Sequence, residues 1–412
     1  MRRQFIVCLV WFSTVFSFYA QELLPENHDT LEIGPRLLFN GNGFHLNYAV
    51  ENSMSRKFLF GGEITDEIKE SSMENHESFN RMGGGFRTTL QYFSDKPVLD
   101  KYPDLSWMVN VSNEAHFSSE YTAGLFSLVF FGNEFSSGTE MSLTNSVGSY
   151  LQYYSAGGGF HNKKTKSFLS LNLLLPRNYL NFGINEGYYL TSEDASSIDL
   201  TLNAEVEYSN SPAYFQGLGI GISFDYNMPF GEGDTNDFHG FFRISGRNLG
   251  VVRLHDIQRY QVNTEMNFDG FALDEINRFF EEDSDISEGL KDSLNLESSN
   301  GSRWMLVPGF LQAGRIVEAN RLSKFQSFFG IRLYTNILYR PLVYAGVDFK
   351  ANENLSFGTQ GTFGGYGRFR IGAYANYRTK IGSVGLGTED ILGVASSKQY
   401  GQSVVLRLLW KL

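Results

Sequence analysis

The stretch "SIDLTLNAEVEY", residues 197–208, alternates between apolar and polar side chains with a period of two. One face carries apolar residues from Ile198 to Tyr208, and the other face carries Asp199, Glu205 and Glu207. Successive side chains of a β-strand point to opposite faces of the sheet. The pattern therefore predicts a strand with one apolar and one polar face.

The same alternation recurs along most of the chain. It is clearest in "FQGLGIGISFDY" (215–226), "PLVYAGVDFK" (341–350) and "YGRFRIGAYANYR" (366–378). Further candidate strands are 81–93, 105–117, 150–160, 165–175, 178–191, 238–249, 303–313, 325–339, 355–363, 381–387 and 402–412, and residues 36–64 leave room for one or two more. Residues 118–135 are apolar without alternation, which fits either a short helix or another strand.

Two all-β folds are compatible with this pattern. A soluble sandwich would turn the apolar faces inward, whereas a transmembrane barrel would turn them toward lipid. The candidate strands are longer than the usual five or six residues, and short turns such as 351–354 and 378–380 connect several of them. Their polar faces are rich in Gly, Asn and Ser, and the charged fraction of 19% is low. These features favour an antiparallel transmembrane β-barrel of about 14 strands, with a range of 12 to 16.

The first 20 residues predict a secretory signal peptide, with Arg2 and Arg3 before an apolar core and Ala20 at its end. The only cysteine, Cys8, lies in this segment. We therefore expect residues 21–412 to form a barrel without disulfides in the outer membrane of a Gram-negative cell. The expected partners are outer-membrane lipid and the barrel-assembly machinery during biogenesis, and other envelope proteins are further candidates.

Residues 257–302 predict an acidic, partly helical insert within the barrel. Leu273, Ile276 and Phe280 fit one helical stripe. With Phe279 they form a candidate plug, although a solvated surface loop fits the sequence equally well. The formal net charge of −11 argues against binding to nucleic acid.

No catalytic motif stands out, and no two histidines have the spacing of metal ligands. We therefore expect no enzyme activity, no metal site and no cofactor. Charged residues on the polar faces are instead expected to line the barrel lumen. In the last strand, Arg407 and Lys411 alternate with Val404, Leu406, Leu408 and Trp410, so the two cations share the inward face. The predicted lumen-lining residues are Asp199, Glu205, Glu207, Asp225, Arg243, Arg247, Arg332, Arg340, Arg368, Arg370, Arg378, Arg407 and Lys411.

The order of several segments resembles an uncharacterised family of Bacteroidota outer-membrane barrels. These segments are "FSLVFFGNEFSSG", "YLQYYSAGGGF", "GLGIGISFDYNMPF", "FFRISGRNLGVVRL" and the end "GLGTEDILG…VVLRLLWKL". The family is similar in style to long-chain fatty-acid transporters of the FadL type and to the PorV and PorP/SprF barrels of type IX secretion. The resemblance covers residues 80–412 and implies a barrel without catalytic residues.

Two classes of function follow as expectations. The first is a channel or transporter for a small hydrophobic or anionic solute. The second is a non-catalytic scaffold of a secretion, motility or envelope-assembly complex. The sequence does not distinguish these two classes.

Overall fold

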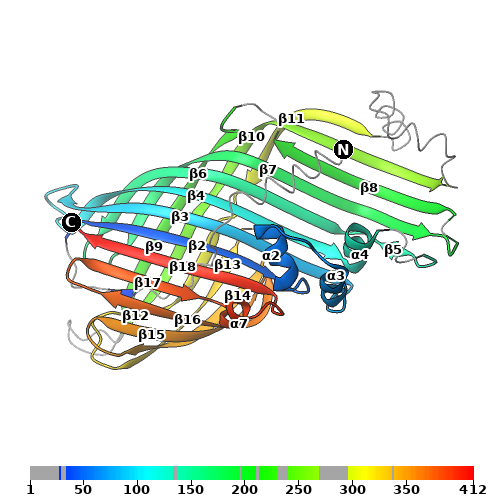
Figure 1. The fold of residues 1–412 in the computed structure, drawn as a ribbon. Helices are drawn as coiled ribbons and strands as arrows, with labels where there is room; N and C mark the ends of the chain where they lie inside the picture. The colour runs from blue at the N-terminus through cyan, green and yellow to red at the C-terminus, as the bar shows by residue number, and fades with distance from the viewer. Residues whose placement is uncertain are drawn as a thin grey trace.

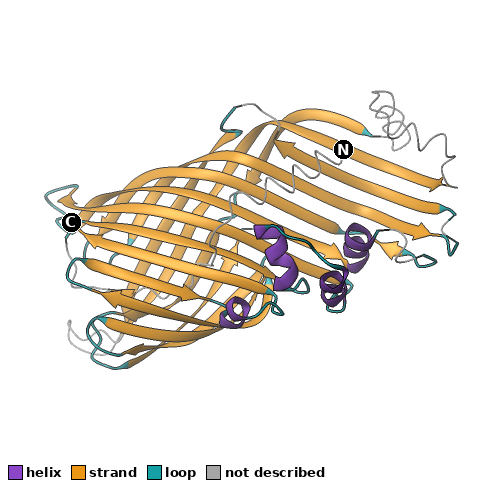
Figure 2. Cartoon of the chain, viewed as in Figure 1, coloured by secondary structure: helices purple, strands orange, loops and turns teal. Residues whose placement is uncertain are grey.

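The chain folds into a closed antiparallel β-barrel (Figures 1 and 2). The structure, a computed structural model, describes residues 27–28, 34–132, 137–194, 196–209, 213–230, 240–268, 296–335 and 338–412. In these residues β18 pairs with β2 through a continuous register from Gly401–Leu46 to Lys411–Arg36, which closes the sheet on itself. Closure leaves no free edge around the ring, as lipid requires.

The elements follow one another with few helices between them. The strands are β1 (Asn27–His28), β2 (Arg36–Asn47), β3 (Phe79–Pro97), β4 (Leu105–Thr122), β5 (Met141–Ser142), β6 (Ser146–Asn162), β7 (Phe168–Thr191), β8 (Ile198–Ser209), β9 (Gly217–Phe230), β10 (Gly240–Phe268), β11 (Glu297–Leu306), β12 (Phe310–Glu318), β13 (Phe325–Tyr334), β14 (Arg340–Lys350), β15 (Leu355–Gly365), β16 (Gly367–Arg378), β17 (Gly382–Thr388) and β18 (Gly401–Lys411). The helices are α2 (Asn52–Phe60), α3 (Asp66–Met73), α4 (Ala123–Phe131) and α7 (Ile391–Ala395).

These strands occupy 14 positions around the barrel. β8 and β9 both pair with β7 and β10, one beyond the other, so together they fill one position. β11 and β12 share a position against β10 in the same way, and β5 continues β6 against β7. β1 adds only a two-residue parallel pairing to β12. The predicted antiparallel barrel of 14 strands is therefore confirmed.

The two ends of the barrel differ in their connections. At the end where the chain terminates, β3–β4, β6–β7, β12–β13, β14–β15 and β16–β17 are joined by short turns. We call this the turn end, and the opposite end the loop end. The loop end carries the four helices of the described residues (Figure 2). None of the helices in the described ranges is long and apolar enough to span a membrane.

The wall of the barrel extends much farther along the strands on one side than on the other (Figure 1), and we call this dimension the height of the wall. The short wall consists of β13–β18, whose strands have 7 to 12 residues. The tall wall consists of β6–β12, in which β7 has 24 residues and β10 has 29. At about 3.3 Å per residue, β10 alone runs for roughly 95 Å.

A line of irregularities crosses the tall wall at one height, and we call it the crease. The register shifts at Gln152/Tyr153 between β6 and β7, and again between Leu254 and Ile257 of β10. Pro176 interrupts β7 between its pairings with β9 and β8. The backbone N–H of Gln216 donates to Pro176 (2.8 Å), and that of His255 donates to Gln216 (2.8 Å), so the breaks lie side by side. The parts of β7, β8, β10 and β11 beyond the crease form an extension that rises past the short wall (Figure 1).

Several sequence expectations need correction. The predicted insert does not begin at 257 or reach 302, because 257–268 belong to β10 and 297–302 to β11. Residues 258–268 alternate in the manner of a strand and pair with β8. The separate strands expected at 165–175 and 178–191 form the single strand β7. Within 118–135, residues 118–122 complete β4 and 123–131 form α4.

Candidate functional site

The outer surface of the barrel is apolar and its interior is polar, which is the reverse of a soluble protein. On β4, Trp107, Val109 and Val111 are exposed, whereas the alternating Asn110, Ser112 and Glu114 are buried. The same arrangement surrounds the barrel. The exposed outward residues include Leu169, Leu171, Leu173, Leu218, Ile220, Ile222, Phe329, Ile331, Leu333, Val343, Val347, Ile371, Val384 and Leu386.

Aromatic side chains border this apolar belt near the turn end. Trp107 packs against Tyr92 with ring centroids 5.2 Å apart, and Phe325 packs against Phe349 at 5.0 Å. Phe160, Tyr226, Phe357, Tyr377 and Trp410 continue the same border. On β15, Phe357 and Phe363 lie six residues apart, or about 20 Å along the strand. This matches the height of an apolar band flanked by aromatic girdles, about 25 Å, in outer-membrane barrels.

Among the described residues, the inner wall carries more cations than carboxylates. Strand alternation places the side chains of several cationic residues on the inner face, and Arg247 lies beside a register shift in β10. Together these cations are Arg36, Arg81, Arg87, Arg243, Arg247, Arg332, Arg370, Arg378, Arg407 and Lys411. The inward carboxylates are Glu114 and Glu120 on β4, Asp225 on β9 and Asp348 on β14. The described part of the interior is thus basic, although the whole chain carries a formal charge of −11.

A polar network centred on Glu114 of β4 crosses the lumen. Its carboxylate accepts hydrogen bonds from Arg87 (2.7 Å), Tyr153 (2.8 Å) and Ser112 (3.0 Å). It also accepts one from the side-chain amide of Asn248 on β10, at 2.5 Å. Because β6, β7 and β9 separate β4 from β10 around the wall, this contact spans the interior.

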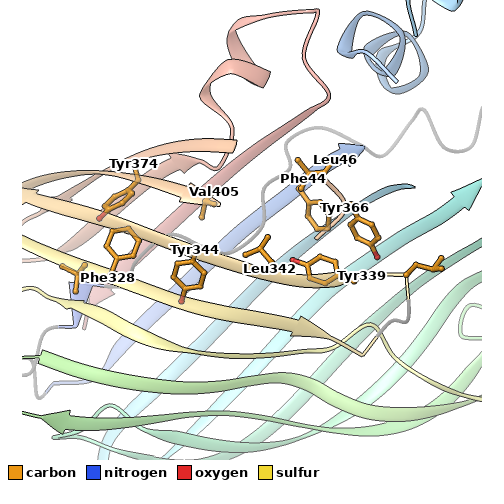
Figure 3. Close-up of a cluster of buried hydrophobic side chains, with 11 residues drawn as sticks. Phe44, Leu46, Phe328, Tyr339, Leu342, Tyr344, Tyr366, Tyr374 and Val405 are labelled. Atoms are coloured by element: carbon orange, nitrogen blue, oxygen red, sulfur yellow. The ribbon is translucent and has the colours of Figure 1, made fainter. Parts of the chain in front are cut away.

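A second set of contacts crosses the lumen closer to the loop end. The imidazole Nε2 of His116 on β4 lies 2.6 Å from the hydroxyl of Tyr366, which lies between β15 and β16. The ring of Tyr366 stacks on Phe44 (6.2 Å between centroids) and meets Tyr339 edge-on (5.1 Å). Figure 3 shows these rings among the buried cluster inside the barrel. Tyr366 lies so close to Gly83 of β3 that a β-carbon there would collide with its ring.

Most of the predicted lumen arginines have acceptors close by. Arg247 makes a two-pronged contact with Asp225 (2.6 and 3.0 Å), and Arg243 lies 3.9 Å from the same carboxylate. Arg332, which is fully buried, donates from Nε to Gln312 at 2.9 Å, and Arg407 donates to Asn40 at 2.8 Å. Arg378 binds Asn320 and backbone oxygens at the turn end, where Lys411 also lies.

Five predicted residues lie elsewhere. Asp199, Glu205 and Glu207 belong to β8, so they lie on the extension and do not share the wall below the crease with the arginines. Glu207 is contacted there by Arg259 and Arg303. Arg340 and Arg368 lie exposed at the loop end, where Arg340 donates to the hydroxyl of Tyr48 (3.3 Å) and Arg368 pairs with Glu77 (2.7 Å).

The proposed plug residues Leu273, Ile276, Phe279 and Phe280 lie outside the described residues.

Sequence reasoning missed several inward charged residues. Arg87, Glu114 and Asp348 each lie on the polar face of an alternating strand, so the same period-two rule could have found them. Asp348 pairs with Arg321 of a turn and accepts from Tyr374 at 2.9 Å. Glu389 could not be found by this rule, because it follows the end of β17.

Glu389 is a fully buried carboxyl group at the loop end of the lumen. Its backbone N–H donates to Ser403 (2.7 Å), which fixes the start of the segment leading to α7. Neither of its carboxylate oxygens has a hydrogen-bond partner among the described residues. Burial raises the pKa of Glu389 to about 8, although the charges of Arg370 and Arg332 act in the opposite direction.

Two further features complete the survey of the described part of the chain. An open cavity of about 390 Å³ lies on the extension, lined by His255, Asp256, Asn300, Gly301 and Ser302, away from the arginine wall. No group of three or more His, Cys, Asp or Glu side chains with the geometry of a metal site occurs in the described ranges.

No protein-family model matches the sequence, and no curated protein matches it. Several solved structures are similar to the chain at low sequence identity. The toluene transporter TodX of P. putida is 10% identical, with a TM-score of 0.39, and the match covers 93% of this chain and 91% of TodX. The monoaromatic hydrocarbon channel CymD is 9% identical, with a TM-score of 0.30 and coverage of 93% and 90%. The translocator domain of the autotransporter NalP from Neisseria meningitidis is 10% identical, with a TM-score of 0.31 and coverage of 100% and 95%.

At these identities and TM-scores, the matches do not indicate a solute for this chain. The resemblance to PorV and PorP/SprF barrels stays a prediction.

Proposed function

We propose that this chain is an outer-membrane barrel that passes small solutes carrying an anionic group. In the described conformation, side-chain contacts across the lumen keep the passage closed. The observation that carries the proposal is the combination of an apolar exterior with a basic interior.

The exterior supports a membrane location for physical reasons. Large apolar side chains such as Leu171, Ile220 and Phe369 would each expose apolar area to water in a soluble protein. A continuous belt of them, bordered by Trp and Tyr, is stable only against lipid. The short turns at one end and the longer, helix-bearing connections at the other support a periplasmic turn end and an extracellular loop end.

The interior supports passage of an anionic group. A channel wall lined mainly by one sign of charge attracts solutes of the opposite sign, and arginines predominate on the described inner wall. An anionic solute would contact Arg332, Arg370 and Arg407 in turn along the short wall. Buried aromatic rings beside these arginines, including Tyr344 and Phe310, would hold the apolar part of such a solute.

Conductance measurements on the purified protein in planar lipid bilayers test the proposal. The Tyr366→Ala variant removes the ring and the hydroxyl that bridge to His116, so we expect its mean conductance to exceed the wild-type value several-fold. Its reversal potential in a KCl gradient should show preference for chloride over potassium. Tyr188→Ala, which removes a tyrosine from the extension, is the matched control and should leave the conductance unchanged.

Two results would contradict the proposal. One is a Tyr366→Ala pore that prefers cations, which would argue against a basic path. The other is wild-type conductance in Tyr366→Ala together with an intact barrel, which would argue against a closed passage at this level.

A scaffold function is the second candidate, and the extension favours it. β11 pairs with β10 and with no other strand of the described ranges, and most of its residues are exposed. An unpaired strand edge is a natural place for another protein to add a strand. Co-purification from native membranes tests this candidate: a stoichiometric protein partner that is lost when β11 is deleted would support it.

A further inference from the structure

We propose that the solute also carries a protonated amine, so that the lumen binds a zwitterion of the amino-acid type. The site is a buried polar patch on the inner face of β15–β17 that comprises Gln360, Thr362, Arg370 and Glu389. This inference rests on the proposed function and names the class of its solute.

The four residues form one contiguous patch. Thr362 of β15 lies directly opposite Arg370 of β16, and Gln360 lies opposite Gly372 in the next inward pair. A β-carbon built on Gly372 would lie 3.1 Å from Cγ of Gln360 and 2.9 Å from Cα of Glu389. Gly372 therefore allows Gln360 and the Glu389 backbone to lie side by side.

The patch contains buried polar atoms that have no partner in the described parts of the chain. Glu389, Gln360, Thr362 and Arg370 are each at most 6% exposed. The acceptors without a hydrogen bond are both carboxylate oxygens of Glu389 and Oε1 of Gln360. The donors without one are Nε of Arg370 and the hydroxyl of Thr362. Buried polar atoms are normally satisfied, so a group of them on one lumen wall indicates a ligand-binding surface.

The neighbouring arginines do not satisfy Glu389. Arg332 donates to Gln312, and the terminal nitrogens of Arg370 donate to the carbonyl oxygens of Gly364 and Arg368. Neither carboxylate oxygen of Glu389 accepts a hydrogen bond from these two guanidinium groups. An ammonium group bound beside Glu389 favours the ionised carboxylate, so the occupied patch offers a negative pole at Glu389 and a positive pole at Arg370, which complements a zwitterion.

The number and type of these atoms define the solute. An ammonium group has three N–H donors, which match the three acceptors on Glu389 and Gln360. A carboxylate accepts hydrogen bonds from Nε–H of Arg370 and from the hydroxyl of Thr362. A free α-amino acid carries both groups on adjacent atoms. Its side chain would extend toward the aromatic cluster that contains Tyr339 and Tyr366.

Binding of three solutes with related carbon skeletons tests the inference. Norleucine carries both charges, hexanoate carries only the carboxylate, and pentylamine carries only the amine. Calorimetry on the full-length protein in detergent should show norleucine binding about tenfold more tightly than hexanoate, because one charge-assisted contact of about 1.4 kcal/mol corresponds to tenfold in affinity. Glu389→Gln, which keeps the shape of the side chain, should abolish that ratio while leaving hexanoate affinity unchanged.

Two further variants separate the two poles. Arg370→Gln should weaken norleucine and hexanoate alike and spare pentylamine. Glu353→Gln changes an exposed glutamate at the turn end and should change none of the three affinities. Should Glu389→Gln fail to fold, Gln360→Leu removes one of the three acceptors and should lower the ratio in the same direction.

The possible outcomes distinguish this inference from the proposed function. Equal wild-type affinities for norleucine and hexanoate, or a ratio that survives Glu389→Gln, would overturn the zwitterion and leave an anion passage standing. If the wild-type protein binds none of the three solutes and the Tyr366→Ala pore prefers cations, both proposals fail.

Discussion

The tall wall and the short wall of the barrel use the same alternation for different purposes. Below the crease, both walls place apolar residues outside and polar residues inside, as on β9 and β16. Above the crease, the tall wall continues without a short-wall counterpart, and its buried carboxylate Glu207 is contacted by two arginines. On the short wall, the buried Glu389 has no such partner in the described ranges. The buried carboxylate of the tall wall is thus neutralised by neighbouring arginines. The buried carboxylate of the short wall has no hydrogen-bond partner in the described residues and can therefore bind a solute.

The largest expected effect on assembly in the membrane concerns the membrane boundary on the tall wall. Leu171→Arg places a charge on the outward face below the crease, where Leu171 is 62% exposed. A charged side chain facing the middle of the bilayer costs about 2–4 kcal/mol, so folded barrel in the outer membrane should fall sharply. The shift in gel mobility between heated and unheated samples measures this fraction.

Val206→Arg is the matched control, because Val206 is also outward and exposed but lies on β8 beyond the crease. It should assemble nearly as well as the wild type. Equal losses in both variants would place the extension inside the membrane and remove the distinction between the two parts of the wall.

The largest expected effect on the unfolding of the assembled barrel concerns the network that joins the walls through the lumen. Glu114→Ala leaves Arg87 buried without its carboxylate, which costs about 3–5 kcal/mol when an ion pair is truly buried. The midpoint of urea unfolding in lipid vesicles should therefore fall well below the wild-type value. Glu186→Ala, an exposed glutamate on the extension, is the control and should leave the midpoint in place.

A smaller effect concerns the dependence of stability on pH. The pKa of Glu389 is raised by burial to about 8, and the charge of Asp390 adds to the shift while Arg370 and Arg332 oppose it. The ordinary pKa of a glutamate is near 4.5. At pH values between 4.5 and 8, the carboxyl group is therefore ionised in the unfolded chain, whereas in the folded barrel without a bound solute it keeps its proton. Its contribution to stability is therefore complete below pH 4.5 and is lost as the pH rises toward 8.

Thermal unfolding in detergent at a series of pH values measures this contribution. The wild-type midpoint should fall between pH 5 and pH 8, and the profile of Glu389→Gln should be flatter over the same interval. Parallel profiles would show that Glu389 ionises normally in the folded barrel.

The smallest effect is expected on the extension. Glu207→Gln removes a charge that faces Arg259 and Arg303, both of which are partly exposed. Water can hydrate the two guanidinium groups, so the stability change should be under about 1 kcal/mol. The conductance of the Tyr366→Ala pore should not change when Glu207→Gln is added. A change in ion selectivity would instead place Glu207 in the path of the solute.

The period-two pattern predicted the barrel and its strand number because each strand meets two different environments. It failed where that signal was interrupted or ambiguous. Because Pro176 interrupts the alternation, β7 was predicted as two strands. The acidic residues after 268 led to a predicted insert that included the last residues of β10. The run at 123–131 could not be assigned, because a short apolar segment looks the same in a helix and in a buried strand.

The candidate site could be predicted only in part. Alternation predicts which face of a strand Arg332, Arg370 and Arg407 occupy, because that face depends on local sequence alone. It cannot give the neighbour across the lumen. The contact between Glu114 and Asn248 joins residues 134 positions apart, and Glu389 reaches its patch from a connecting segment.

The crease also makes the height of the wall adjustable. Because the register already shifts there in β6 and β10, residues can be added to or removed from the strands above it without rotating any side chain below it. Changes in even numbers on paired strands would also preserve which face each remaining residue occupies. The strands below the crease have a height set by the thickness of a lipid layer, whereas the length of the extension above the crease can change without altering them.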